Sequence, residues 1–231
     1  VFVDFSKDMQ KGTAKNGVEV LYKKNEKNDL FQLSIAIDFG SKDNKVISFA
    51  SGYFGFLGTA EKTAAQIKKE LYDLACNANV TVAGEKVYIG VSGLSENMEK
   101  AIAIVEDILN HPKISEESVQ NSIANVLKSR EDSKSRQNTI FQRMLSYASY
   151  GKDNMRKYLV TNEEVQKIKA QDIINQIKAM TSQPQRIMYY GDMSLTDLQK
   201  VITEKHSVHP AKKPMKQNPD FDRLQTKENK V

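Results

Sequence analysis

Two alternating stretches near the start of the chain predict β-strands. Apolar residues occupy every second position from 31 to 39, and a shorter alternating stretch at 18–22 precedes them across a polar turn. Alternation with a period of two is typical of a strand with one buried face. The turn signal Asn16-Gly17 stands just before the first stretch. We therefore expect residues 18–22 and 30–39 to pair as a β-hairpin.

Three further stretches have strand character. Residues 80–82 and 86–92 flank the short turn Ala83-Gly84-Glu85, which predicts a second hairpin by the same alternation. Near the other end of the chain, residues 185–190 are typical of one more strand.

Helical spacing accounts for most of the remaining chain. Apolar residues recur every three to four positions from Val46 to Leu57, and Gly58 stands where a helix would end. Thr59 is placed to cap a second helix at 60–76. Comparable patterns and cap residues predict further helices that start after Ser95, Ser115, Thr161 and Ser194, and at 140–148 and 170–180.

The order of these elements indicates the fold class. Two strands, two helices and two strands are followed by a run of helices, one strand and one helix, which is too segregated for a parallel doubly wound sheet. We expect an α+β two-layer sandwich, in which helices pack on one face of a mostly antiparallel sheet of about five to six strands. This single domain is expected at residues 15–205, after an N-terminal lead-in at 1–14.

Residues 206–231 are expected to connect this domain to a following one. They contain three prolines and mixed charges without an apolar period, which is typical of a connector. The chain also lacks an initiator methionine and a signal peptide, so we expect it to be a segment of a longer protein.

Most of the net positive charge lies in this basic connector. The 231 residues carry a formal net charge of +5, and seven basic against three acidic residues fall within 205–231. A nucleic-acid footprint requires a basic patch with aromatic side chains on the folded surface, and no such patch is indicated. No apolar run approaches the roughly 20 residues of a membrane span. We therefore expect no nucleic-acid partner and no membrane insertion.

Cysteine and histidine give no candidate reactive or metal site. The single cysteine, Cys76, excludes an intramolecular disulfide and is expected to be a buried thiol late in the helix 60–76. His111 precedes a proline at a helix end, where it faces the helix dipole. His206 and His209 are spaced i, i+3 in the connector with no third ligand nearby.

Several short motifs occur in the order that is typical of one peptidase family. They are Asn16-Gly-Val-Glu-Val-Leu21, Asp38-Phe-Gly40, Leu57-Gly-Thr59, Val91-Ser-Gly-Leu94 and Arg186-Ile-Met-Tyr-Tyr-Gly191. Over about residues 14–203 the chain resembles the insulinase/pitrilysin zinc metallopeptidases. Within that family it looks most like the third of four homologous domains of the long single-chain bacterial members. The resemblance implies the LuxS/MPP-like metallopeptidase fold.

The resemblance also implies where a zinc site would lie. In the family's catalytic domain, an H-x-x-E-H motif precedes the Gly-Thr pair; its two histidines bind zinc and its glutamate activates a water molecule. The matching positions here are Phe49, Gly52 and Tyr53, which supply neither imidazole nor carboxylate. The third ligand is a glutamate on a later helix, yet residues 118–130 contain no Asp or Glu. We expect no catalytic, cofactor-binding or metal residue in this segment, with zinc in the catalytic domain of the parent protein, and Phe49 and Tyr53 in the core.

The sequence therefore predicts a non-catalytic domain of a zinc metalloendopeptidase that degrades peptides. The segment should be inactive alone and should form part of a substrate-enclosing chamber and an interdomain interface. Its expected partners are other domains of the same polypeptide and unfolded peptide. The sheet face opposite the helices, with Glu19 and Tyr88, is the candidate chamber wall. The alternative is a non-catalytic binding or assembly subunit related to the family, and the resemblance implies the periplasm or cell envelope of a bacterium.

Overall fold

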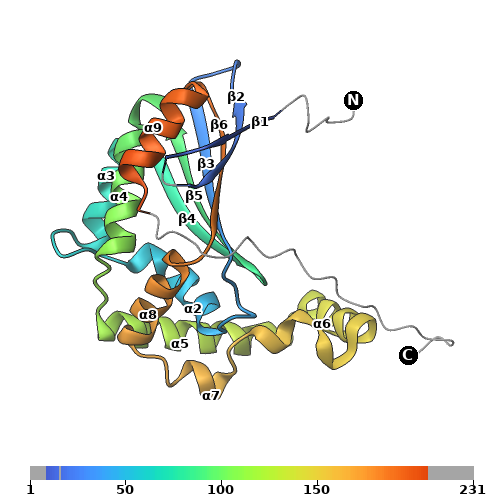
Figure 1. Cartoon of the computed structure of the whole chain (residues 1–231). Helices are drawn as coiled ribbons and strands as arrows, with labels where there is room; N and C mark the ends of the chain where they lie inside the picture. Colours follow the sequence, from blue (N-terminus) through green and yellow to red (C-terminus); the bar gives the residue numbers. More distant parts are fainter. Residues whose placement is uncertain (1–8, 16, 208–231) are drawn as a thin grey trace.

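One twisted sheet forms the centre of the fold, and helices cover one of its faces (Figure 1). The computed structural model describes residues 9–15 and 17–207. In this part of the chain the strand order is β1-β2-β6-β3-β5-β4. Neighbouring strands are antiparallel except β2 and β6, which are parallel. The strands are β1 (Gln10–Thr13), β2 (Glu19–Lys24), β3 (Leu30–Ile37), β4 (Cys76–Ala83), β5 (Lys86–Leu94) and β6 (Gln185–Gly191).

The helices fall into three groups. Figure 1 shows α3, α4 and α9 along one face of the sheet, α2, α5 and α8 below it, and α6 projecting to the side. They are α2 (Val46–Tyr53), α3 (Ala64–Asp73), α4 (Met98–Asn110), α5 (Glu116–Asp132), α6 (Gln137–Tyr150), α7 (Asn162–Val165), α8 (Ala170–Thr181) and α9 (Leu195–Lys205). The predicted α+β class with a mostly antiparallel sheet is confirmed.

The first predicted hairpin is wrong, because β2 and β3 are not neighbours. Strand β6 lies between them and pairs with both. Alternation identifies a strand and its buried face, but it carries no information about a partner that is distant in sequence. The turn at Gly17, which has φ of 86°, instead joins β2 to β1. The sheet therefore begins inside the segment that was expected to be a lead-in.

The hairpin of β4 and β5 is confirmed, although β4 starts earlier than expected. The helix predicted at 60–76 spans only Ala64–Asp73. Its N-cap is Thr63, whose hydroxyl accepts from the Gln66 amide while the Gln66 side chain accepts from the Thr63 amide. This reciprocal capping box fixes the start of the helix more firmly than Thr59 could. Cys76 is consequently the first residue of β4 and lies outside the helix.

His206 belongs to the fold rather than to a connector. Its Nδ1 lies 2.6 Å from Glu106 Oε1 and its Nε2 lies 2.8 Å from Gln185 Oε1, and all three side chains are buried. The Gln185 amide nitrogen donates to the Thr181 carbonyl, which orients the Gln185 oxygen toward the ring. This network ties the end of α9 to α4 and β6. His209 lies outside the described residues, as does most of the segment 206–231.

The core lies between the sheet and its helices. Four alternate residues of β3, Phe31, Leu33, Ile35 and Ile37, are buried on the helix side. Phe49 and Tyr53 on α2 are buried as well, with exposed fractions of 7% and 1%. The core stripe predicted for this helix is therefore present.

Replacing Phe49 with Ala should lower the free energy of unfolding by about 3–5 kcal/mol, because the substitution leaves a cavity beside a rigid sheet. Denaturant unfolding of the isolated chain measures this change. Phe56 is the matched control, because its ring is 56% exposed and rests on Lys68; Phe56→Ala should cost less than about 1 kcal/mol. Equal losses for the two variants would contradict the assigned burial of Phe49.

Candidate functional site

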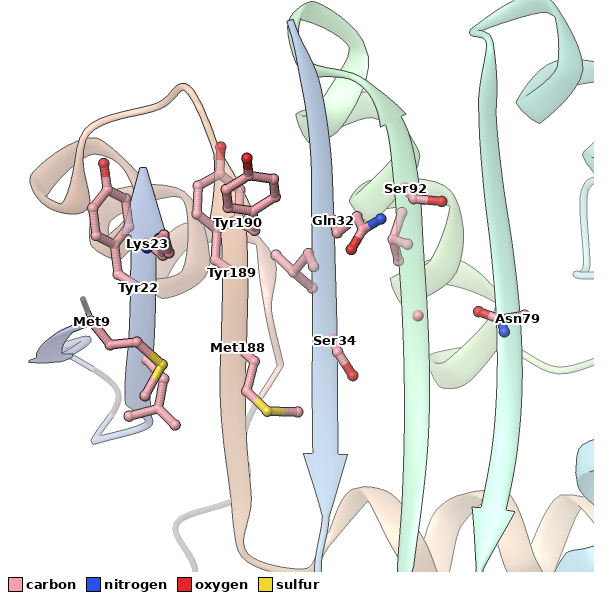
Figure 2. A pocket seen from close by; sticks show the side chains of 14 residues that line it. Met9, Tyr22, Lys23, Gln32, Ser34, Asn79, Ser92, Met188, Tyr189 and Tyr190 are labelled. Carbon is pink, nitrogen blue, oxygen red and sulfur yellow. The ribbon is translucent and has the colours of Figure 1, made fainter. Parts of the chain in front are cut away.

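An open groove of about 720 Å³ runs across the face of the sheet that carries no helix. Figure 2 shows its lining side chains rising from neighbouring strands, with tyrosines gathered at one end. The residues that line it come from β2, β6, β3, β5 and β4, together with Met9. The groove therefore depends on the complete sheet and not on one loop.

The floor of the groove is one row of residues in register across five strands. Leu21 pairs with Met188, Met188 with Ser34, Ser34 with Gly90, and Gly90 with Asn79. A Cβ atom at Gly90 would collide with Asn79 Oδ1, so glycine allows the Asn79 amide to lie across the sheet. One half of the row is therefore aliphatic, and the other half offers hydroxyl and amide groups.

A second row borders the first. Lys23 pairs with Tyr190, Tyr190 with Gln32, and Gln32 with Ser92. The Tyr190 hydroxyl donates to Asn25 Oδ1 at 3.1 Å, which holds the ring at the groove's edge. Apart from Lys23, the groove-lining side chains in both rows are uncharged. A surface of this kind favours ligands with apolar side chains and exposed amide groups.

Two stacked tyrosines stabilise the aromatic end of the groove. The rings of Tyr22 and Tyr189 are 5.8 Å apart and nearly parallel. The Tyr22 hydroxyl donates to the Met193 carbonyl, and the Met193 amide donates to the Tyr189 oxygen. Burial raises the pKa of Tyr189 to about 12, although the Met193 hydrogen bond opposes this shift. Burial and nearby acidic groups, chiefly Asp192, also raise the pKa of Tyr22.

Glu19 and Tyr88 lie on the helix-free face, as predicted. The cross-strand row that contains them is Glu19, Arg186, Ala36, Tyr88 and Thr81. Neither residue lines the groove itself. The Arg186 guanidinium binds the Glu19 carboxylate at 2.6 Å, so these two charges neutralise each other beside the groove.

The three positions that we match to the zinc motif from the sequence lie together on α2. Phe49 and Tyr53 point into the core, whereas Gly52 is exposed and a Cβ atom there would meet nothing within 4 Å. Burial raises the pKa of the Tyr53 hydroxyl, and the nearby Ser118 hydroxyl of α5 opposes this shift. These side chains do not fit a zinc ion, because they offer no imidazole or carboxylate.

The histidines and the cysteine are dispersed. His111 is exposed and contacts Asp107 at 3.0 Å, while His206 is enclosed in the network described above. Cys76 is half-buried, and burial raises the pKa of its thiol. Within residues 9–15 and 17–207, no group of three His, Cys, Asp or Glu side chains is placed to hold a metal ion. None of the helices in this part of the chain is long and apolar enough to cross a membrane.

Sequence reasoning missed the residues that line the groove. The residue types at the outward-facing positions of each strand could have indicated the groove. Met188, Tyr190, Gln32 and Ser34 are uncharged where an exposed sheet face commonly carries Lys or Glu. Their convergence depends on the strand order, which the sequence did not reveal.

The sequence matches the family model for Insulinase (Peptidase family M16) over residues 19–163. It is 23% identical over 174 residues to the mitochondrial-processing peptidase subunit beta of Neurospora crassa, covering 73% of this chain and 37% of that protein. It is 29% identical over 109 residues to an uncharacterized zinc protease of Rickettsia felis, covering 46% of this chain and 26% of that protein. The chain thus spans well under half the length of these relatives.

Solved structures share the fold at low sequence identity. A peptidase M16 inactive domain from Pseudomonas fluorescens superposes with a TM-score of 0.73 and 17% identity, over 91% of this chain and 54% of that chain. The periplasmic protease PqqL from Escherichia coli gives a TM-score of 0.71 and 18% identity, over 94% of this chain and 25% of that chain. In each neighbour, the shared fold is only one part of a longer chain.

Alkaline pH should test the burial of Tyr189. Its folded-state pKa of about 12 lies above the ordinary tyrosine pKa of 10.0, so the neutral form is favoured in the fold and stability is lost as pH rises through this window. Between pH 9 and pH 11 the wild-type chain should lose about 1 kcal/mol more stability than Tyr189→Phe. Denaturant unfolding at both pH values measures the difference. Parallel pH profiles for the two proteins would show that Tyr189 titrates normally.

Proposed function

The chain belongs to the insulinase family of peptidases, and we propose that it is a non-catalytic domain of a zinc metalloendopeptidase. In this proposal the domain supplies part of the wall that encloses an unfolded peptide, while another domain of the same polypeptide holds the zinc. The observation that carries the proposal is the groove across the helix-free face of the sheet, in which Lys23 is the one charged residue among those that line it.

The identity of the residues on α2 supports a non-catalytic role. Phe49, Gly52 and Tyr53 occupy the positions that we match to the family motif, and α5 has no carboxylate from Ser118 to Arg130. A zinc peptidase needs two imidazoles, a carboxylate ligand and a general base in one geometry. Both helices lack their share of that set, so the chemistry belongs elsewhere in the parent protein.

The groove suits an extended peptide. Its aliphatic half, with Leu21 and Met188, can cover apolar side chains, while Ser34 and Asn79 can hydrogen-bond main-chain amides in either direction. The absence of groove-lining charges other than Lys23 removes any strong preference for charged sequences. An unfolded peptide exposes both kinds of group, whereas a folded protein buries most of them.

The lengths of the relatives support a multidomain parent. The fold fills about a quarter of PqqL and about half of the P. fluorescens chain. We therefore propose that the domain at 15–205, extended by β1 and His206, is one of several similar domains, with 206–231 leading to the next. The position as third of four domains remains a prediction. Because PqqL is a periplasmic protease, we propose the bacterial periplasm or envelope as the compartment.

The isolated chain should retain no stoichiometric zinc after dialysis. The positions matched to the zinc ligands carry phenylalanine and tyrosine, which bind zinc far more weakly than histidine does. Elemental analysis of the purified chain measures the metal content. One zinc per chain that is lost on substitution at Tyr53 would overturn the non-catalytic assignment.

Cleavage of a quenched fluorescent peptide tests the function. The chain alone should cleave nothing, whereas its parent should lose activity when this segment is deleted. In the intact parent, Met188→Glu should raise KM for an apolar peptide by about tenfold, because it places a charge in the groove. Thr81→Glu, on the same face but outside the groove, is the matched control.

Three results would count against the proposed function. Metal-dependent cleavage by the isolated chain would refute the non-catalytic role. Full activity of a parent that lacks this segment would show that the segment is not needed to enclose the peptide. Equal effects of Met188→Glu and Thr81→Glu on KM would show that the groove has no special part in substrate binding.

A further inference from the structure

Helix α6 exposes the side that an amphipathic helix normally buries. Five large side chains form the α6 stripe: Ile140, Phe141, Met144, Leu145 and Tyr147, each more than 40% exposed. Thr139, Arg143 and Ser146, on the opposite side, are only partly exposed. Positions 140, 141, 144, 145 and 147 share one face at 3.6 residues per turn. The polar side of α6 therefore faces the domain, and the apolar side faces away from it.

An exposed apolar stripe of this kind marks an interaction surface. Isolated exposed apolar residues are common, but a continuous row on one helix face is not. Figure 1 shows α6 projecting to the side of the domain, away from the sheet. No residue of the stripe lines the groove on the sheet, so the two surfaces are separate.

Three basic side chains lie on or near α6. Arg143 on α6 donates to Ser133 Oγ at 2.8 Å, and its buried Nε has no hydrogen-bond partner. Arg130 donates to Asn162 Oδ1 at 2.8 Å. Partial desolvation, and then repulsion from Arg143 and Arg130, lower the pKa of Arg156, so the three guanidinium groups lie near one another. The Arg143 bond to Ser133 and the Arg130 bond to Asn162 both go to neutral oxygens. A partner that brings carboxylates would therefore gain favourable ion pairs here.

We propose that the α6 stripe is the surface on which another insulinase-type domain of the same polypeptide docks. The docking face of that domain is apolar and bordered by Asp or Glu. This inference rests on the proposed function, in which the chain is one domain of a larger peptidase.

Two observations favour such a domain over other occupants. Chains with this fold are longer than the present one, and this fold covers only 54% and 25% of them. A second copy docked about a two-fold axis would bring the same three arginines from both copies into one interface, which adds like charges there. A domain of the same polypeptide avoids this conflict and is held at high effective concentration.

The first test measures association with the rest of the parent. The remainder of the parent polypeptide, made without this segment, is the probe, and its affinity for the 231-residue chain is measured by calorimetry. Phe141→Ser with Leu145→Ser should weaken binding at least tenfold. Tyr72→Ser, at an 81% exposed position on α3, is the control and should leave binding unchanged. Thermal melts should be unchanged for both variants, because all three side chains are exposed.

Arg156→Glu should weaken binding and reduce its salt dependence.

A second test needs no separated fragments and no activity. Met144 is 65% exposed, so dilute peroxide should oxidise it readily in the isolated chain. In the intact parent its oxidation should slow at least tenfold if the stripe is covered. Mass spectrometry of the Met144 peptide gives both rates. An intact parent that cleaves no peptide but still protects Met144 from peroxide would count against the proposed function and not against the docking surface.

Four outcomes would overturn the docking proposal. Equal oxidation of Met144 in the chain and in the parent would show an uncovered stripe. Unchanged binding by the Phe141→Ser, Leu145→Ser variant would place the interface elsewhere. Self-association of the isolated chain that this variant abolishes, with binding to the remainder intact, would indicate a homodimer surface. Faster Met144 oxidation after removal of residues 208–231 would show that the chain covers its own stripe.

Discussion

The pairing of β6 with both β2 and β3 is the contact on which the rest of the structure depends. Ile187 and Tyr189 of this strand are buried, and its two edges bond to strands from the start of the chain. Without β6, the β1–β2 hairpin would be separated from β3, β5 and β4. The groove would also lose Met188 and Tyr190. Closing so long a loop is entropically costly, although the cost rises only logarithmically with its length. The burial of alternate residues of β6, such as Ile187, offsets it.

The buried network around His206 supports the same pairing. Gln185, the first residue of β6, accepts from His206, and Glu106 accepts from both the His206 ring and the Ser207 amide. Removing one partner of such a buried network would leave the remaining polar groups without their hydrogen bonds, which is costly. The network therefore fixes where α9 ends relative to α4 and β6.

Local patterns were predictable from the sequence, and distant partners were not. The β4–β5 hairpin was predicted correctly because its two strands are joined by the short turn at Gly84. The pairing of β2 with β3 was wrong because β6 comes from far along the chain. His206 was assigned to a connector because prolines follow it, while its partner Glu106 lies 100 residues away. The outward positions of Glu19 and Tyr88 followed from alternation alone, but the groove beside them also required the strand order.

The aromatic residues on α2 contribute to the stability of this domain and not to a zinc site. A zinc site holds polar groups in fixed positions and commonly sacrifices stability for activity. Phe49 and Tyr53 instead add apolar volume to the core, next to Leu57 and Ile47, all of which are buried. Some of the apolar side chains that stay accessible lie in the groove, such as Met188, and along α6. Apolar surface that the domain does not cover for itself becomes favourable only when peptide or protein covers it. In the proposed function, the groove and the α6 stripe are the surfaces through which the domain acts on others.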